Sequence, residues 1–176
     1  MFVNFNSDLP QIKDFIATRV REQAAVSEQI SAVEFAFRLS QSCHLFLHFD
    51  TRDNHLRDGN WSSAAYEDEP TLEIKHWNEA FEVANDEGIS VVLPSGETHS
   101  LSSEAADEEA VVAIFGDALR TIVLSAAAEG VFDSLPLRSD CQLDMEEFDG
   151  MWGWPAVYED VGKTNILSQL LSAKEG

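Results

Sequence analysis

The stretch ISAVEFAFRLSQSCHLFLHFDTR, residues 30–52, decides the fold class. Apolar side chains occupy every second position of residues 33–39 and again of residues 45–49. A period of two is typical of strands that pack one face on a core, and aromatic residues favour strands. The short polar break between the two runs indicates a tight turn. The sequence therefore predicts a β-hairpin over about residues 30–50, with one apolar and one mixed face.

Helical periodicity flanks the hairpin on both sides. In four segments, apolar residues recur at spacings of three and four, as they do on the buried side of an amphipathic helix. The third segment is apolar around most of its girth, so we expect it at the centre of the core. Helices are expected at about residues 9–24, 77–87, 104–129 and 164–173. Further strands are expected near residues 89–101 and 141–145.

These elements fit one domain. A chain of 176 residues can bury a sizeable core without disulfides or metals. No internal repeat or low-complexity linker divides it. Strands and helices in this order indicate the α+β class. We therefore expect residues 1–176 to form a single α+β domain, in which an antiparallel sheet carries its helices mainly on one side.

The chain is strongly acidic. Asp and Glu number 32 against 11 Lys and Arg, and the net charge is −21. Nucleic acids and anionic membranes attract proteins through Lys and Arg, so neither is an expected partner. The charge is uneven, because residues 66–109 carry thirteen acids and one base, and residues 131–160 carry eight acids and one base. Two such blocks favour a basic protein as the partner.

The expected location is the cytoplasm. The N-terminal stretch MFVNFNSDLP lacks the basic and long apolar regions of a signal peptide. No uncharged apolar run reaches the ~18 residues of a membrane span. Cys43 and Cys141 are the two cysteines, and they do not form a disulfide framework. We expect both thiols to be reduced.

Motifs for catalysis or cofactor binding do not occur in the sequence. The stretch PSGETHS, residues 94–100, has one glycine and no lysine, so it is not a phosphate-binding loop. The patterns G-x-S-x-G, H-E-x-x-H and C-x-x-C are absent. Cys43 and His44 are neighbours, but adjacent strand residues point to opposite faces, so we do not expect a nucleophile and base pair. The sequence predicts no cofactor and favours a protein that is not an enzyme.

Candidate ligands for a metal ion are scattered. His44 and His48 share a face of the expected strand but lie about 13 Å apart, too far to hold one ion. His48, Asp50 and His55 would converge only if the following loop folds back. In so acidic a chain, a solvated acidic face explains most carboxylate clusters. Two clusters could nevertheless supply a divalent-ion site or a glycosidase pair: Asp144, Glu146 and Glu147, and Glu67, Asp68 and Glu69.

The stretch DGMWGWPAVYED, residues 149–160, is the candidate binding segment. Its glycines and proline exclude a regular helix, and in an extended chain Trp152 and Trp154 face the same side, with Tyr158 further along. The indoles would either clamp the edge of the core or form an exposed recognition strip, since Trp and Tyr dominate interface hot spots. In the second case, an acidic rim would consist of Glu146, Glu147, Asp149, Glu159 and Asp160.

Three stretches carry a resemblance: VEFAFRL (33–39), LFLHFDTR (45–52) and MWGWPAVYED (151–160). In a small acidic α+β chain they resemble bacterial immunity proteins of polymorphic toxin systems, and the chain is equally similar to uncharacterised small acidic bacterial domains. The first resemblance implies a non-catalytic protein that neutralises a basic toxin. Two alternatives stay open, a carboxylate- or metal-dependent enzyme acting on a small substrate, and a housekeeping domain whose charge serves solubility. The oligomeric state does not follow from the sequence.

Overall fold

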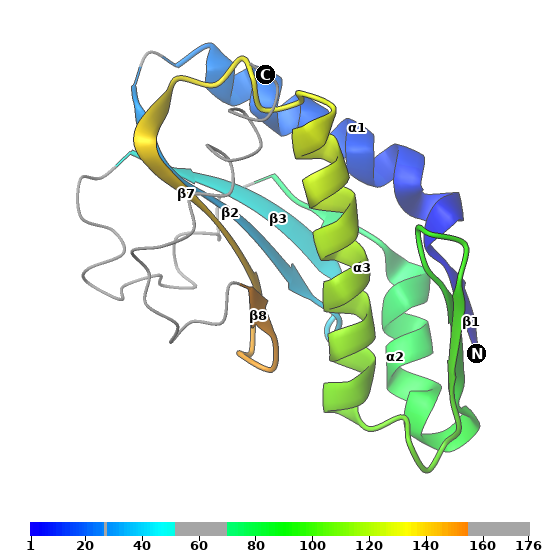
Figure 1. Ribbon diagram of the computed structural model, residues 1–176. Helices are drawn as coiled ribbons and strands as arrows, with labels where there is room; N and C mark the ends of the chain where they lie inside the picture. The colour runs from blue at the N-terminus through cyan, green and yellow to red at the C-terminus, as the bar shows by residue number, and fades with distance from the viewer. Residues whose placement is uncertain (27, 52–69, 155–176) are drawn as a thin grey trace.

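Two sheets and three helices make up the described part of the chain, which comprises residues 1–26, 28–51 and 70–154. The larger sheet has the strand order β4-β3-β2-β7-β8, and the smaller sheet has the order β1-β5-β6. In the computed structural model, helices α1 and α3 lie side by side across one face of the larger sheet (Figure 1). This arrangement confirms the α+β class.

The predicted hairpin is the centre of the larger sheet. Its two strands pair antiparallel, with Phe35 opposite Leu47 and Phe37 opposite Leu45. The central strand β2 is buried on both faces for nearly its whole length. The strands of this sheet are β2 (Ile30–Arg38), β3 (His44–Asp50), β4 (Leu72–Glu73), β7 (Leu137–Glu147) and β8 (Gly153–Trp154).

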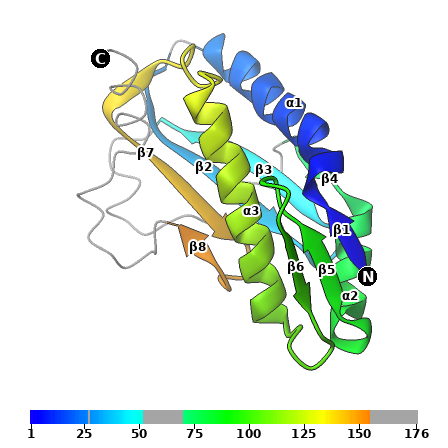
Figure 2. The same cartoon turned by 45° about the vertical axis from the view of Figure 1, so that its right-hand side comes forward.

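The expectation of one antiparallel sheet is wrong. β7 pairs with β2 in parallel, because the chain between β3 and β7 contains helices that carry it back to the starting end of β2. The hairpin of β5 (Ile89–Val92) and β6 (Thr98–Leu101) does not join the larger sheet. It pairs instead with β1 (Phe2–Asn4), also in parallel. Figure 2 shows this smaller sheet beside α2 and α3.

Helices α1 and α3 start where a side chain caps them. α1 (Phe5–Ala24) begins four residues before the expected position, because Asn4 Oδ1 accepts a hydrogen bond from the backbone N–H of Asn6. α3 (Glu108–Ala128) begins later than expected, because Asp107 is its cap. α2 (Lys75–Glu87) ends at Gly88, as predicted. The expected helix at residues 164–173 lies outside the described residues.

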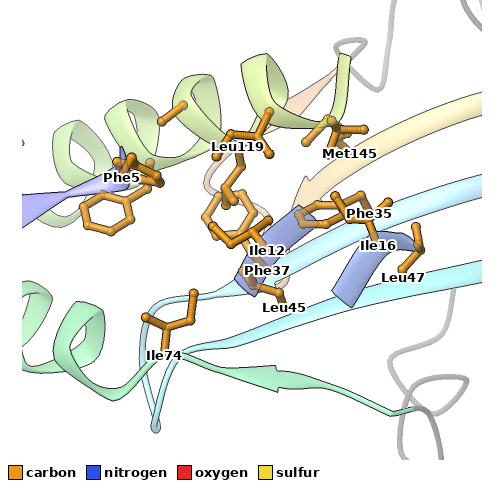
Figure 3. Packing of buried hydrophobic residues seen from close by; sticks show 14 of the residues in the cluster. Phe5, Ile12, Ile16, Phe35, Phe37, Leu45, Leu47, Ile74, Leu119 and Met145 are labelled. Atoms are coloured by element: carbon orange, nitrogen blue, oxygen red, sulfur yellow. The ribbon is translucent and has the colours of Figure 1, made fainter. Parts of the chain in front are cut away.

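The core lies between the larger sheet and the helices. Ile12 and Ile16 of α1 and Leu119 of α3 meet Phe35, Phe37, Leu45, Leu47 and Met145 of the sheet (Figure 3). All of these side chains are 1% exposed or less, and burial of apolar surface is the main force that holds the layers together. The core thus uses one face of the alternating pattern in β2 and β3.

Helix α3 occupies the centre of this core, as its composition predicts. Among the described residues it is the one helix long and apolar enough to cross a membrane, but more than half of its most apolar window is buried inside the protein. It packs against α1, α2 and β7. Its apolar character therefore fits a core helix.

Candidate functional site

The turn between β7 and β8 is built on a buried carboxylate. Glu147 is 2% exposed, and its Oε2 accepts hydrogen bonds from the backbone N–H groups of Asp149 (2.8 Å) and Met151 (3.3 Å). Burial raises the pKa of Glu147, and the two backbone N–H groups oppose that rise. Gly150, at φ 80°, completes the turn. Glu147 therefore shapes the turn, and its carboxylate is not part of a solvent-facing rim.

Trp152 and Trp154 lie on the helix-facing side of the sheet, and both are half-buried. The ring of Trp152 lies 5.8 Å from that of Phe37. It also fills the space beside Gly116 of α3, where an added Cβ would lie 2.4 Å from Trp152 Cδ2. Trp154 pairs in register with Met145, whose side chain is in the core. The two indoles thus share one side, as predicted, and each packs on the edge of the core while keeping part of its surface exposed.

A shallow hollow of about 650 Å³ lies next to this turn. One wall is the start of α3, with the exposed carboxylates of Asp107, Glu108 and Glu109. The other walls are Asn85 of α2 and the backbone turn at Gly150 and Met151. We call this group of six residues the acidic hollow. It joins residues of the acidic block 66–109 to residues of the acidic block 131–160, although about forty positions separate them in the sequence.

One base lies close to the turn. The Arg38 guanidinium stacks over the Phe148 ring at 4.2 Å, and its Nη2 lies 3.8 Å from Asp149 Oδ1. Asp149 remains about half exposed, with 52% of its side chain accessible. This ion pair is long and solvent-exposed, so it offsets only part of the negative charge at the turn.

The face of the larger sheet turned away from α1 and α3 carries a row of titratable side chains. The register places Glu34 of β2 between His48 of β3 and Asp144 of β7, and neighbouring strands lie about 4.8 Å apart. Glu34 is 1% exposed, and Asp144 Oδ2 is buried without a hydrogen-bond partner among the described residues. Burial, and secondly the charge of Glu146, raises the pKa of Asp144 to about 6. Asp144 therefore changes its charge close to neutral pH.

The metal ligands proposed from the sequence are only partly placed. His48 and Asp50 share the second face of β3, and Asp50 is 2% exposed. The described ranges contain no group of three or more His, Cys, Asp or Glu side chains that could hold a metal ion. His55 and the cluster of Glu67, Asp68 and Glu69 lie outside those ranges, as do Tyr158, Glu159 and Asp160 of the proposed binding strip.

Cys43 is a packing residue. It is fully buried at the end of the β2–β3 turn, whereas His44 is half-buried on the second face. Burial raises the pKa of the Cys43 thiol strongly, and the nearby charges of Asp8 and Glu73 add to that rise. The thiol is therefore protonated at neutral pH, and thiolate chemistry at this position is disfavoured.

Sequence reasoning overlooked four contributors to these sites. They are Asp107, Glu108 and Glu109 at the start of α3 and Gly116 in its middle. The high charge of residues 66–109 was the available signal for the first three. A glycine in the middle of a helix, where it costs about 1 kcal/mol relative to alanine, was the signal for a close contact.

Comparison with protein families, with curated proteins and with solved structures gives no match to this chain. The resemblance to immunity proteins therefore rests on the sequence features given above.

Proposed function

We propose that this protein is a non-catalytic acidic binding protein that engages a basic protein partner and, as in immunity proteins, neutralises it. The observation that supports this best is the acidic hollow, where three exposed carboxylates at the start of α3 face the turn that leads into the half-buried Trp152 and Trp154. Exposed carboxylates attract a cationic partner over about 10 Å and set its orientation. Large aromatic side chains then supply most of the contact energy.

The proposed binding surface consists of the acidic hollow, Asp149, Trp152 and Trp154. Trp152 follows Met151, a wall of the hollow, directly in the chain, and its half-buried ring packs on Phe37 and Gly116. The proposed location is the cytoplasm. Both cysteines are buried and neither belongs to a disulfide, which is compatible with a reducing compartment.

A titration with a lysine decapeptide as the cationic probe tests the site. Isotope-labelled protein should show its largest chemical-shift changes at Glu108, Gly150 and Met151. The triple variant Asp107→Asn, Glu108→Gln, Glu109→Gln should bind roughly tenfold more weakly, because three exposed charge pairs contribute about 0.5 kcal/mol each. Asparagine keeps the helix cap at position 107, so the fold should be retained.

The matched control is the triple variant Asp14→Asn, Glu28→Gln, Glu97→Gln. It removes the same charge from exposed positions outside the hollow. Its affinity should fall only about twofold, through the loss of net charge. Equal losses in the two triple variants, with shifts scattered over the surface, would refute the proposed site and favour a charge that serves solubility alone.

A second candidate function is a carboxylate-dependent enzyme, with or without a metal ion. The observation that favours it is the row of Glu34, Asp144 and His48, in which Asp144 has a pKa suited to proton transfer near neutral pH. A metal-dependent enzyme should gain melting temperature with Mg²⁺, Mn²⁺ or Zn²⁺ and lose it with a chelator. A binding protein should be indifferent to both.

A further inference from the structure

The turn between β2 and β3 has an unusual backbone. Gln41, Ser42 and Cys43 have φ values of 53°, 82° and 41°, and none of them is a glycine. For residues with a Cβ, this left-handed region brings the Cβ close to the following carbonyl oxygen. Single asparagine or glycine residues adopt it routinely, but a run of three other residues does not. The backbone of the turn is therefore strained, and contacts with residues outside the turn must maintain its conformation.

The contacts that hold the turn come from α2 and from the residue before it. Asn78 Nδ2 donates a hydrogen bond to the carbonyl oxygen of Leu39 at 3.0 Å, and the backbone N–H of Ile74 donates one to the carbonyl oxygen of Cys43, also at 3.0 Å. Leu39 and Cys43 are buried at the two ends of the turn. Gln41 and Ser42 at its tip are exposed. The turn is therefore held by buried contacts at its ends, whereas at its exposed tip Gln41 Oε1 accepts a long, 3.5 Å hydrogen bond from Arg38 Nη1.

Helix α2 is itself fixed to α1. The indole Nε1 of Trp77 donates a hydrogen bond to Asp8 Oδ2 at 2.9 Å, and His76 Nε2 lies 2.9 Å from the same oxygen. Trp77 is fully buried between Phe5 and Phe115. The position of α2 thus decides whether the two hydrogen bonds to the turn exist.

We propose that residues 39–43 form a latch, in which hydrogen bonds from Asn78 and Ile74 hold residues 41–43 in a strained left-handed conformation that relaxes when those two bonds break. Strained backbone persists only where the surrounding structure determines it, and it occurs often in switch regions. The conformation of the turn and its two hydrogen bonds with Asn78 and Ile74 are then one coupled equilibrium. This inference is independent of the proposed binding function.

Glycine substitution tests the strain without removing a buried contact. Ser42→Gly should raise the melting temperature by about 2–4 °C, as expected for a chain of this size when one strained residue is relieved. Two controls share its chemistry. Ser42→Ala retains the Cβ and should not raise the melting temperature. Ser40→Gly introduces a glycine at a position without positive φ and should lower the melting temperature. If the Ser42→Gly protein is no more stable than the Ser42→Ala protein, the turn is not strained and the proposal is wrong.

Coupling to α2 is tested by the variant Asn78→Ala. It removes the hydrogen bond to Leu39, and hydrogen exchange at the Ile74 amide should accelerate about tenfold as the latch opens. In a Ser42→Gly background the turn holds its shape unaided, so the acceleration should be about threefold or less. The control is Glu82→Ala, which removes only the 3.3 Å hydrogen bond between Asn78 and Glu82. It should leave hydrogen exchange at the Ile74 amide unchanged in both backgrounds. An equal acceleration in both backgrounds would show that the turn and α2 are not coupled.

Discussion

The two faces of the larger sheet differ in chemistry although the same strands form both. Towards α1 and α3, β2 presents Val33, Phe35 and Phe37, which are fully buried among apolar side chains. Away from them it presents Glu34, which is also buried but stands in a row with His48 and Asp144. One face thus stabilises the fold through apolar burial, whereas on the other face burial disfavours the charged form of Asp144.

The largest effect is expected on the helix-facing side. Phe35→Ala should lower the free energy of unfolding by about 3–5 kcal/mol, because it leaves a cavity between Leu47 and Met145. Phe46→Ala on the second face is the matched control, since Phe46 is only half-buried and should cost clearly less. Urea denaturation measures both. Equal losses would mean that the two faces contribute equally to stability.

On the second face a substitution should stabilise. Folding raises the pKa of Asp144 from 3.8 to about 6, so the protonated form is favoured in the folded state. That contribution is complete below pH 3.8 and is lost as the pH rises through about 6. Asp144→Asn should therefore leave stability unchanged near pH 4 and raise it by ~2–3 kcal/mol above pH 7.

Chemical denaturation at several pH values follows this difference. Glu146→Gln is the control, because removing its charge should lower the pKa of Asp144 without removing the carboxyl group. A pH-independent gain for Asp144→Asn would mean that the burial of charge is not the cause.

The contact between Trp152 and α3 is expected to have an intermediate effect. Gly116→Ala should destabilise by about 1–3 kcal/mol despite the better helix propensity of alanine, because the new Cβ would overlap the indole ring. In a Trp152→Ala background the same change should be neutral or slightly stabilising. Thermal unfolding of the four proteins measures this coupling, and additive effects would contradict a direct contact.

The same series separates the two interpretations of the indoles. A large loss of stability in Trp152→Ala and Trp154→Ala indicates clamps on the core. Retained folding with weaker binding of the lysine decapeptide indicates anchors for a partner.

The smallest effect concerns the helix that covers the apolar face. Asp107 Oδ1 accepts the backbone N–H of Ala110 at 2.8 Å. Asp107→Ala should cost about 1 kcal/mol, whereas Asp107→Asn should cost only a few tenths, because asparagine caps nearly as well. If both variants lose equal stability in thermal unfolding, the charge of Asp107 and not its cap stabilises α3.

Much of the local structure could be predicted from the sequence. The alternation in 33–39 and 45–49 gave the hairpin, since a period of two depends only on neighbouring residues. The spacing of apolar residues predicted α1, α2 and α3. Most of the observed helix ends lie within a few residues of the expected ones. The ends themselves were harder, because Asn4 and Asp107 compete with nearby Ser and Asp residues as caps, and only packing selects between them.

The candidate sites could be predicted only in part. The segment 149–154 and its paired indoles were identified, but not the burial of Glu147, which depends on how the chain turns back on its own backbone N–H groups. The row of Glu34, His48 and Asp144 requires the register of three strands, one of them parallel and a hundred positions away.

The sequence by itself determined the α+β class, the apolar face of the hairpin, the core helix and the large negative charge, because each follows from composition or short-range periodicity. Only the tertiary structure decided that β7 runs parallel to β2, that Gly116 receives Trp152, and that two acidic blocks meet at one hollow. Those features depend on contacts between residues far apart in the sequence, which the burial of apolar surface in the folded chain selects and short-range periodicity does not specify.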